Sequence, residues 1–189
     1  MKALAITSLS AAALALAGCG PKATGNADAG GNEAAIAATN STAPAPAATG
    51  GQAFANAAAA SDAFEIASSR LALTSASSSA IKRYAQKMID AHTDSTAQLK
   101  TAAASASPAI TPDPSLTADQ QAKLDALMSL SGKAFDQAYA AAQTEGHQKT
   151  LDTLRSYAGS GDVPSLKAFA TTITPIVAAH LNMAKSLKV

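Results

Sequence analysis

The clearest hydrophobic pattern in the chain is a stripe of residues three and four positions apart between Ile81 and Leu99. Its members are Ile81, Ala85, Met88, His92, Ser95 and Leu99. This spacing places all six side chains on one face of an α-helix, as expected for a helix that packs against a core. Five members are apolar or small, whereas His92 puts an imidazole where an apolar side chain is expected.

The same periodicity predicts four long helices and one short helix. The long helices are predicted at 52–75, 79–106 and 133–158 and from about 164 onward, and the short helix at 118–130. The first has its apolar face at Phe54, Ala57, Ala60, Phe64, Ala67 and Leu71, and the last at Leu166, Phe169, Ile173, Ile176, His180, Met183 and Leu187. Local signals agree with these starts, since Thr117 and Gln120 are spaced as a capping box and Pro164 suits a first helical turn.

The lengths of the connections favour one all-α architecture. The links between the first and second long helices and between the third and fourth are short, but the 107–132 connection in the middle is long. A long middle connection can travel along the bundle, as it does in ferritins. The sequence therefore predicts a ferritin-like four-helix bundle over residues 52–189, with the short helix in its long connection.

The first 18 residues are predicted to be a lipoprotein signal peptide. Lys2 precedes an uncharged apolar run, 3–17, which is too short to span a bilayer as a helix. The run ends in Leu16-Ala17-Gly18-Cys19, which resembles the bacterial lipobox, in which the cysteine is lipidated and becomes the mature N-terminus. Gly20 after that cysteine is typical of lipoproteins sent to the outer membrane. An ordinary secretion signal with a chance cysteine is the alternative.

Between Cys19 and residue 51 the chain has almost no large apolar side chains. It consists mainly of Ala, Gly, Asn, Thr and Pro, so it cannot bury enough surface to offset the entropy of ordering. We expect a disordered tether that holds the bundle off the membrane, although a short Ala-rich helix at 34–38 is an alternative. The expected location is the bacterial cell envelope, with the chain anchored by lipid at Cys19 and facing the periplasm.

Composition narrows the possible partners. The formal net charge is +1, 14% of residues are charged, and no basic cluster is interleaved with aromatic residues, which argues against nucleic acid as a partner. Cys19 is the only cysteine, so the chain forms no internal disulfide and a lipidated Cys19 offers no thiol to a metal. The membrane is the expected partner through the N-terminal lipid, and the sequence identifies no protein partner.

The three histidines of the chain are its main candidates for chemistry. His92, His147 and His180 each lie on the apolar stripe of a different predicted helix, and Glu65 borders the stripe of the remaining one. All four lie roughly 13–16 residues after the predicted start of their helix, about 20–24 Å along the axis. The sequence thus predicts a polar layer in the middle of the bundle.

Two interpretations of this layer stay open. Three imidazoles and one carboxylate suit a divalent transition metal such as Zn, Fe or Cu, with Asp62 and Tyr139 nearby to orient the imidazoles. Alternatively, the histidines hydrogen-bond to Glu65, Tyr139 or one another and fix the helix register without a metal. The second interpretation predicts a non-catalytic envelope protein with a structural, interaction or stress role.

Enzymatic chemistry has little support in the sequence. The Glu-x-x-His motif of di-iron bundles is absent, because the residues three before the histidines are Ile89, Thr144 and Val177. The chain also lacks Gly-x-Ser-x-Gly, His-Glu-x-x-His and a phosphate-binding glycine loop. We assign no catalytic residue, and an enzyme that uses the central layer is a third interpretation.

Several segments together resemble a known family. They are Phe54 with Ala58 and Glu65, the run from Ala85 to Thr93, the run from Ser131 to Tyr139 leading to His147, and Pro175 leading to His180. Over about residues 52–187 the chain is similar to the domain of unknown function 4142, a set of bacterial proteins predicted to be periplasmic or in the outer membrane. The family more usually has Asp-His where this chain has Ala91-His92. The resemblance implies a ferritin-like helical bundle in the envelope and no established activity.

Overall fold

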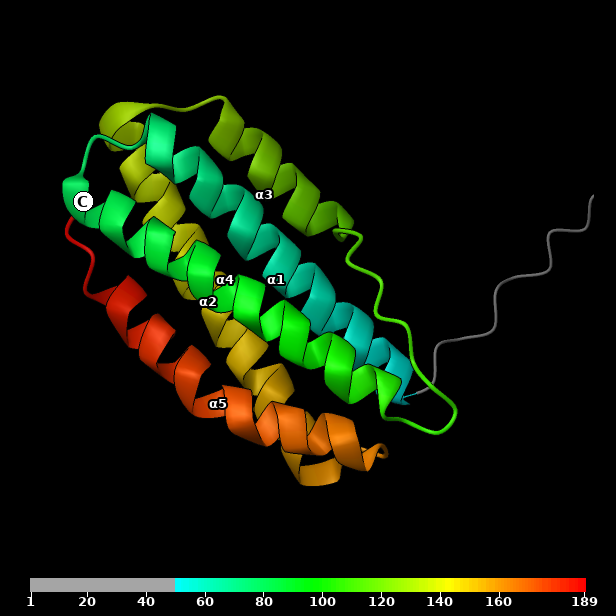
Figure 1. Ribbon diagram of the computed structural model, residues 1–189. Coiled ribbons are helices and arrows are strands. Elements are labelled where there is room, and N and C mark those ends of the chain that lie inside the picture. Colours follow the sequence, from blue (N-terminus) through cyan, green and yellow to red (C-terminus); the bar gives the residue numbers. More distant parts are fainter. Residues whose placement is uncertain (1–49) are drawn as a thin grey trace, which may run out of the picture. The chain divides into compact units, whose positions relative to one another are not determined.

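The computed structural model describes residues 50–189. The predicted signal peptide, Cys19 and nearly all of the predicted tether therefore lie outside the described residues. The described chain forms five helices: α1 (Gly50–Ser75), α2 (Ser79–Ala104), α3 (Ala118–Met128), α4 (Gly132–Ser160) and α5 (Pro164–Lys185) (Figure 1). The predicted all-α class is confirmed, since the β-type pairing within residues 50–189 is a single bridge between Ala76 and Gly132.

Helix starts follow the local signals of the sequence. Thr117 and Gln120 form the predicted capping box of α3, each side chain pairing with the other residue's backbone N–H. The hydroxyl of Ser78 accepts from the backbone N–H of Ile81 at the start of α2. At the N-terminus, α1 begins at Gly50, slightly before the predicted position 52. Gly51 is buried there, and a Cβ on it would lie 2.5 Å from a methyl group of Val163, so only glycine permits this close approach.

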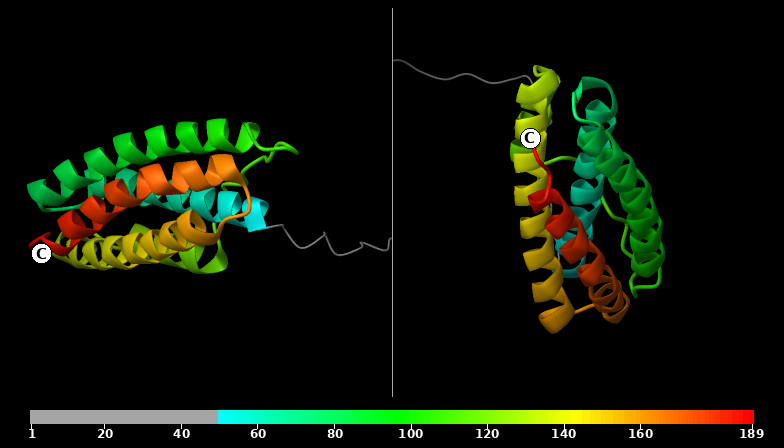
Figure 2. Two further views of the ribbon diagram at one scale, coloured as in Figure 1. Left: turned by 90° about the horizontal axis from the view of Figure 1, so that it is seen from below. Right: turned by 90° about the vertical axis from the view of Figure 1, so that its left-hand side faces the viewer.

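The four long helices run along one another, as both views in Figure 2 show. Helix α1 packs on α2 and α4, and α5 packs on α4 and α2, while α3 lies on α1 and α4. This arrangement is compatible with the predicted four-helix bundle. None of the helices within residues 50–189 is both long and apolar enough to cross a bilayer.

Two apolar clusters fill the core at different heights. The Phe54 cluster includes Phe54, Ala55, Leu99, Leu151, Leu154, Leu166, Phe169, Ile173, Val177 and Leu181. The Phe135 cluster includes Ala72, Ile81, Tyr84, Met88, Leu127, Phe135, Tyr139 and Ala184. Between them lie buried polar residues from all four long helices, namely Asp62, Glu65, His92, Gln143, His147 and His180.

The clusters also give the direction of each helix. Helices α1 and α5 run from the Phe54 cluster to the Phe135 cluster, whereas α2 and α4 run the opposite way. Because α2 and α4 are parallel, the chain between them must return along the molecule, and α3 lies in this return. Side chains of α1 hold the connection: Gln52 donates to the carbonyl of Thr111 at 2.8 Å, and Asn56 accepts from the backbone N–H of Asp113 at 3.0 Å.

Candidate metal centre

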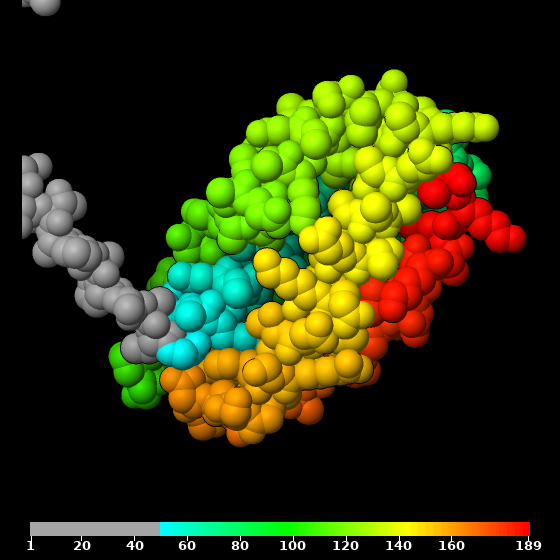
Figure 3. Space-filling view, turned by 180° about the vertical axis from the view of Figure 1, so that it is seen from behind, coloured from blue at the N-terminus to red at the C-terminus, as the bar shows by residue number. Residues whose placement is uncertain are grey.

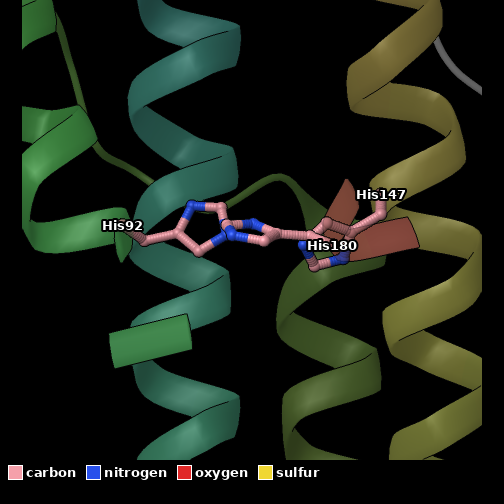
Figure 4. A group of neighbouring side chains, drawn as sticks. All are labelled: His92, His147 and His180. Atoms are coloured by element: carbon pink, nitrogen blue, oxygen red, sulfur yellow. The ribbon is translucent and has the colours of Figure 1, made fainter. Parts of the chain in front are cut away.

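Three imidazoles from three helices meet in the polar layer between the two apolar clusters. Figure 4 shows His92, His147 and His180 at one level, with their rings turned toward one another. The ring centroids are 5.5 Å apart for His92 and His147 and 5.6 Å apart for each of the other two pairs. One ring nitrogen from each residue lies within 4.8 Å of the other two. The rings therefore form a nearly equilateral triangle.

Helix periodicity brings the three residues to this place. His92 follows Met88 and precedes Ser95 on the stripe of α2, and every member of that stripe from Ile81 to Leu99 is buried. His147 lies on α4 and His180 on α5, each on the buried side of its helix. Within residues 50–189, these three form the one group of side chains with donor atoms close enough to hold a single metal ion.

The ring of His92 is fixed by a carboxylate. Its Nδ1 lies 2.8 Å from Oδ1 of Asp62, and Thr96 donates its hydroxyl to the other oxygen of Asp62 at 3.2 Å. Nε2 of His92 is buried and has no hydrogen-bond partner in the described chain. Burial lowers the pKa of His92, but the hydrogen bond to Asp62 and the charges of Glu65 and Asp62 outweigh it, so the net shift is upward.

A backbone carbonyl fixes the ring of His147. Its Nδ1 donates to the carbonyl of Gln143 at 2.9 Å, and its Nε2 is buried without a partner among residues 50–189. Burial and the neighbouring charge of His92 lower the pKa of His147 to about 3. The same two causes lower the pKa of His180 to about 4. Both rings are therefore neutral at pH 7, which is the form that binds metals.

Glu65 borders the histidines but lies on the far side of one ring. Its Oε1 is 3.7 Å from Nδ1 of His147, the nitrogen that already donates to Gln143, and Glu65 is not part of the three-nitrogen group. Its Oε2 is buried without a partner in the described region. Burial raises the pKa of Glu65 to about 7, although the charge of His92 opposes this shift. The predicted fourth ligand thus occupies a neighbouring position, and its pKa of about 7 leaves its carboxyl group only partly ionised at pH 7.

The two residues expected to orient the imidazoles have different surroundings. Asp62 holds His92, as described above. The hydroxyl of Tyr139 pairs with that of Ser69 at 2.7 Å, and its ring packs against Phe135 and Tyr84 in the apolar cluster. Tyr139 therefore makes no hydrogen bond to a histidine within residues 50–189.

Two buried polar residues of α4 were not predicted from the sequence. Gln143 supplies the carbonyl that orients His147, because residues four apart on a helix lie on one face. Asp136 of α4 is 3% exposed and accepts hydrogen bonds from the backbone N–H groups of Ser77 and Ser78 and from the Ser77 hydroxyl. The serine-rich turn after 75 was a signal for a helix cap, but nothing local indicates a partner 58 residues away.

These observations define an all-helical protein with a buried cluster of three histidines in its core. The chain belongs to the family described as Domain of unknown function (DUF4142), whose model matches residues 36–187. The family predicted from the sequence is thereby confirmed. Comparison with curated proteins and with solved structures gave no match.

Proposed function

We propose that this protein binds one divalent transition metal through His92, His147 and His180. The observation that carries the proposal is the set of buried ring nitrogens without partners, Nε2 of His92, Nε2 of His147 and Nδ1 of His180. A buried polar atom without a partner costs about 1–3 kcal/mol, so three together need a physical reason. A shared metal ion gives all three nitrogens a partner.

The spacing of the rings fits coordination by one ion. A histidine nitrogen about 2.0–2.1 Å from zinc puts the ring centroid about 3.2 Å from the ion, and three such rings stand about 5–5.5 Å apart. The observed separations are 5.5 and 5.6 Å. The Nδ1 atoms of His92 and His147 are engaged with Asp62 and with a carbonyl, which leaves Nε2 as the ligand atom.

Charge favours a divalent ion. The layer contains three imidazoles that are neutral when they ligate, and two buried carboxylates, Asp62 and Glu65. Without an ion, the pKa of about 7 leaves Glu65 partly protonated at pH 7. A divalent ion would favour its ionised form, and the double charge would then balance both carboxylates. Imidazole ligands suit Zn, Cu and Fe, and three protein ligands leave a fourth position for water or another small ligand.

We place this site in a ferritin-like four-helix bundle. The parallel α2 and α4 joined by a return connection that contains α3 support this topology. The site differs from that of di-iron bundles, since Glu-x-x-His is absent and one metal is enough to satisfy the three nitrogens. Oxidation of iron at a paired site is therefore not part of the proposal.

We further propose that the protein is a lipoprotein of the bacterial envelope. The support comes from the sequence alone, from the apolar run that ends in Leu16-Ala17-Gly18-Cys19 and from Gly20 after it. Lipid at Cys19 would tether the helical domain to the outer membrane, on the periplasmic side. Labelling with a radioactive fatty acid tests this, and loss of the label in Cys19→Ser is the expected result.

Metal content tests the metal site. The full-length chain purified from metal-replete medium should contain about one equivalent of zinc, copper or iron by plasma mass spectrometry, as expected for one set of three ligands. His180→Leu should contain none, although the variant stays folded. A wild-type protein without metal, and without stabilisation on addition of Zn²⁺, Cu²⁺ or Fe²⁺, would contradict the proposal.

A structural role for the layer is the second candidate. The hydrogen bonds that join His92, Asp62 and Thr96 favour it, since such a network can fix helix register without any ion. On this reading the protein is a non-catalytic envelope protein with a structural, interaction or stress role, and metals have no effect on its stability.

A further inference from the structure

A groove between α1, α3 and α4 leads from the protein surface to Glu65. Its volume is about 120 Å³, which is room for several water molecules. The rim carries the charged side chains of Asp119, Lys123 and Glu145, and the inner end is formed by Glu65 and Gly146. Figure 3 shows the hollow between α3 and α4, with α1 beside it. The groove thus connects solvent to a carboxylate that borders the histidine cluster.

Gly146 leaves the inner end of this groove free of side-chain atoms. A Cβ at this position would lie 3.1 Å from Oε1 of Glu65, which is tighter than ordinary contact. Gly146 also directly precedes His147, so α4 exposes bare backbone next to a histidine of the cluster. Glycine is unfavourable inside a helix, and here it occupies the place where a carboxylate approaches the helix backbone.

Weak contacts cover the outer part of the groove. Gln120 of α3 donates to the carbonyl of Ala60 at 3.3 Å, and Lys123 forms ion pairs with Glu145 at 2.7 Å and Asp119 at 3.0 Å. These partners are largely exposed, and exposed ion pairs contribute little to stability. Only Leu127 of α3 is buried. Leu127 packs in the Phe135 cluster, so the cover is weakest at Gln120 and Lys123.

We propose that divalent cations reach the three histidines through this groove, and that Glu65 is the carboxylate that receives them at its inner end. Gly146 keeps that end open. The inference rests on the proposed metal site and adds a route and a role for Glu65. A negative charge at the inner end offsets part of the cost of removing water from the cation before it reaches the imidazoles.

The alternative route leads directly past His180. This residue is 8% exposed, compared with 3% for His92 and 1% for His147, so its ring is the one nearest to solvent. Lys87, however, lies near enough for its charge to help lower the pKa of His180. An incoming cation is repelled by Lys87 on this side. The groove also contains Lys123 and Lys149, but its three carboxylates, Asp119, Glu145 and Glu65, outnumber them, which favours the groove.

Uptake rates test the route. The full-length protein, stripped of metal by a chelator, is mixed with Co²⁺ in a stopped-flow instrument, and the ligand-field absorption gives the association rate and, by titration, the Kd. Gly146→Ala should slow association about tenfold, which is the effect of a small rise in barrier. Gly159→Ala is the matched control, since a Cβ there meets nothing within 4 Å, and it should leave the rate unchanged.

Gly146→Ala also changes the surroundings of Glu65, so two further variants test the route at positions that do not contact this residue. The hydroxyls of Ser61 and Thr150 pair at 2.8 Å in the wall of the groove, and Thr150→Leu should slow association by filling it. Lys87→Gln should have little effect on the rate. If Co²⁺ binds the wild type but Gly146→Ala and Thr150→Leu associate at the wild-type rate, or if Lys87→Gln alone accelerates uptake, the route is overturned. Failure of the wild type to bind Co²⁺ overturns the metal site itself, which is a different result.

Discussion

Replacing His180 with leucine should stabilise the metal-free protein. His180 is 8% exposed, its Nδ1 is buried without a partner, and its ring makes no hydrogen bond within residues 50–189. Its pKa of about 4 leaves it uncharged at pH 7. Leucine is similar in size and carries no polar atom. Removing one unpartnered buried nitrogen should therefore add about 1–3 kcal/mol to the free energy of unfolding.

Urea denaturation in the presence of a chelator measures this effect. With a slope of about 2 kcal/mol/M, the middle of the usual range in urea, the midpoint of His180→Leu should rise by about 0.5–1.5 M. Metal at a thousand times the Kd should reverse the order, because binding then stabilises the wild type by about 4.1 kcal/mol and leaves the variant unaffected. The substitution thus separates stability from metal binding.

The same substitution at His92 is the matched control and should have the opposite sign. His92→Leu leaves Asp62, which is 5% exposed, without its imidazole partner. Breaking a buried pair in this way typically costs about 3–5 kcal/mol. If His180→Leu is also less stable than the wild type in chelator, the imidazole of His180 contributes to metal-free folding, and the argument from unpartnered nitrogens is refuted.

Three other substitutions test separate parts of the structure. Asp136→Ala removes the acceptor of two backbone N–H groups in the turn between α1 and α2. Urea denaturation should show a free energy of unfolding lower by about 2–4 kcal/mol, and a loss below about 1 kcal/mol would contradict the buried contact. Asp62→Asn should weaken metal binding about 10–100-fold by calorimetric titration, because the carboxylate orients an imidazole, and an unchanged Kd would exclude that role. Gly132→Ala should destabilise the protein by about 1–2 kcal/mol, since Gly132 has a φ of 62°, which alanine adopts only with strain. Gly159→Ala should be neutral or slightly stabilising, because a Cβ there meets nothing within 4 Å. Thermal unfolding distinguishes the two.

Helix positions could be predicted well because their signals are local. Capping residues, proline and three-to-four spacing act within a few residues, and the observed ends differ from the predicted ones by at most a few positions. The predicted stripe of α2 is buried at every position, because polar residues on the rest of the helix make its apolar face easy to recognise. The all-α class and the family followed from these same segments.

The buried faces of α1 and α5 were harder to predict. Ala57 is exposed although it was assigned to the core, and Ala55 and Ala59 are buried instead. Alanine and serine occur all round α1, so hydrophobic periodicity hardly distinguishes its faces. In α5, Ile176 is 42% exposed and Val177 is buried, because two adjacent apolar residues leave the phase of the stripe ambiguous.

The candidate site shows the same limit. Equal distance from helix ends was enough to bring three histidines to one level, because helix rise is constant. It could not determine which side of a ring a neighbour occupies, and Glu65 lies beside Nδ1 of His147 and not among the converging nitrogens. Tyr139 lies on the same helix as His147, two turns before it. The spacing could not show that its hydroxyl pairs with the hydroxyl of Ser69 and not with a histidine.

The hydrogen bonds around the cluster make the position of Glu65 informative. Metal-binding histidines usually donate their second N–H to a carboxylate or carbonyl, and here His92 uses Asp62 while His147 uses the carbonyl of Gln143. Glu65 therefore is not needed to orient His147. If the proposed metal site holds, its burial next to Gly146, at the end of the groove, is explained by a role in receiving the cation. A purely structural layer would instead use Glu65 to stabilise the charged form of His92, whose pKa it raises, and would leave its Oε2 without a hydrogen-bond partner in the described part of the chain.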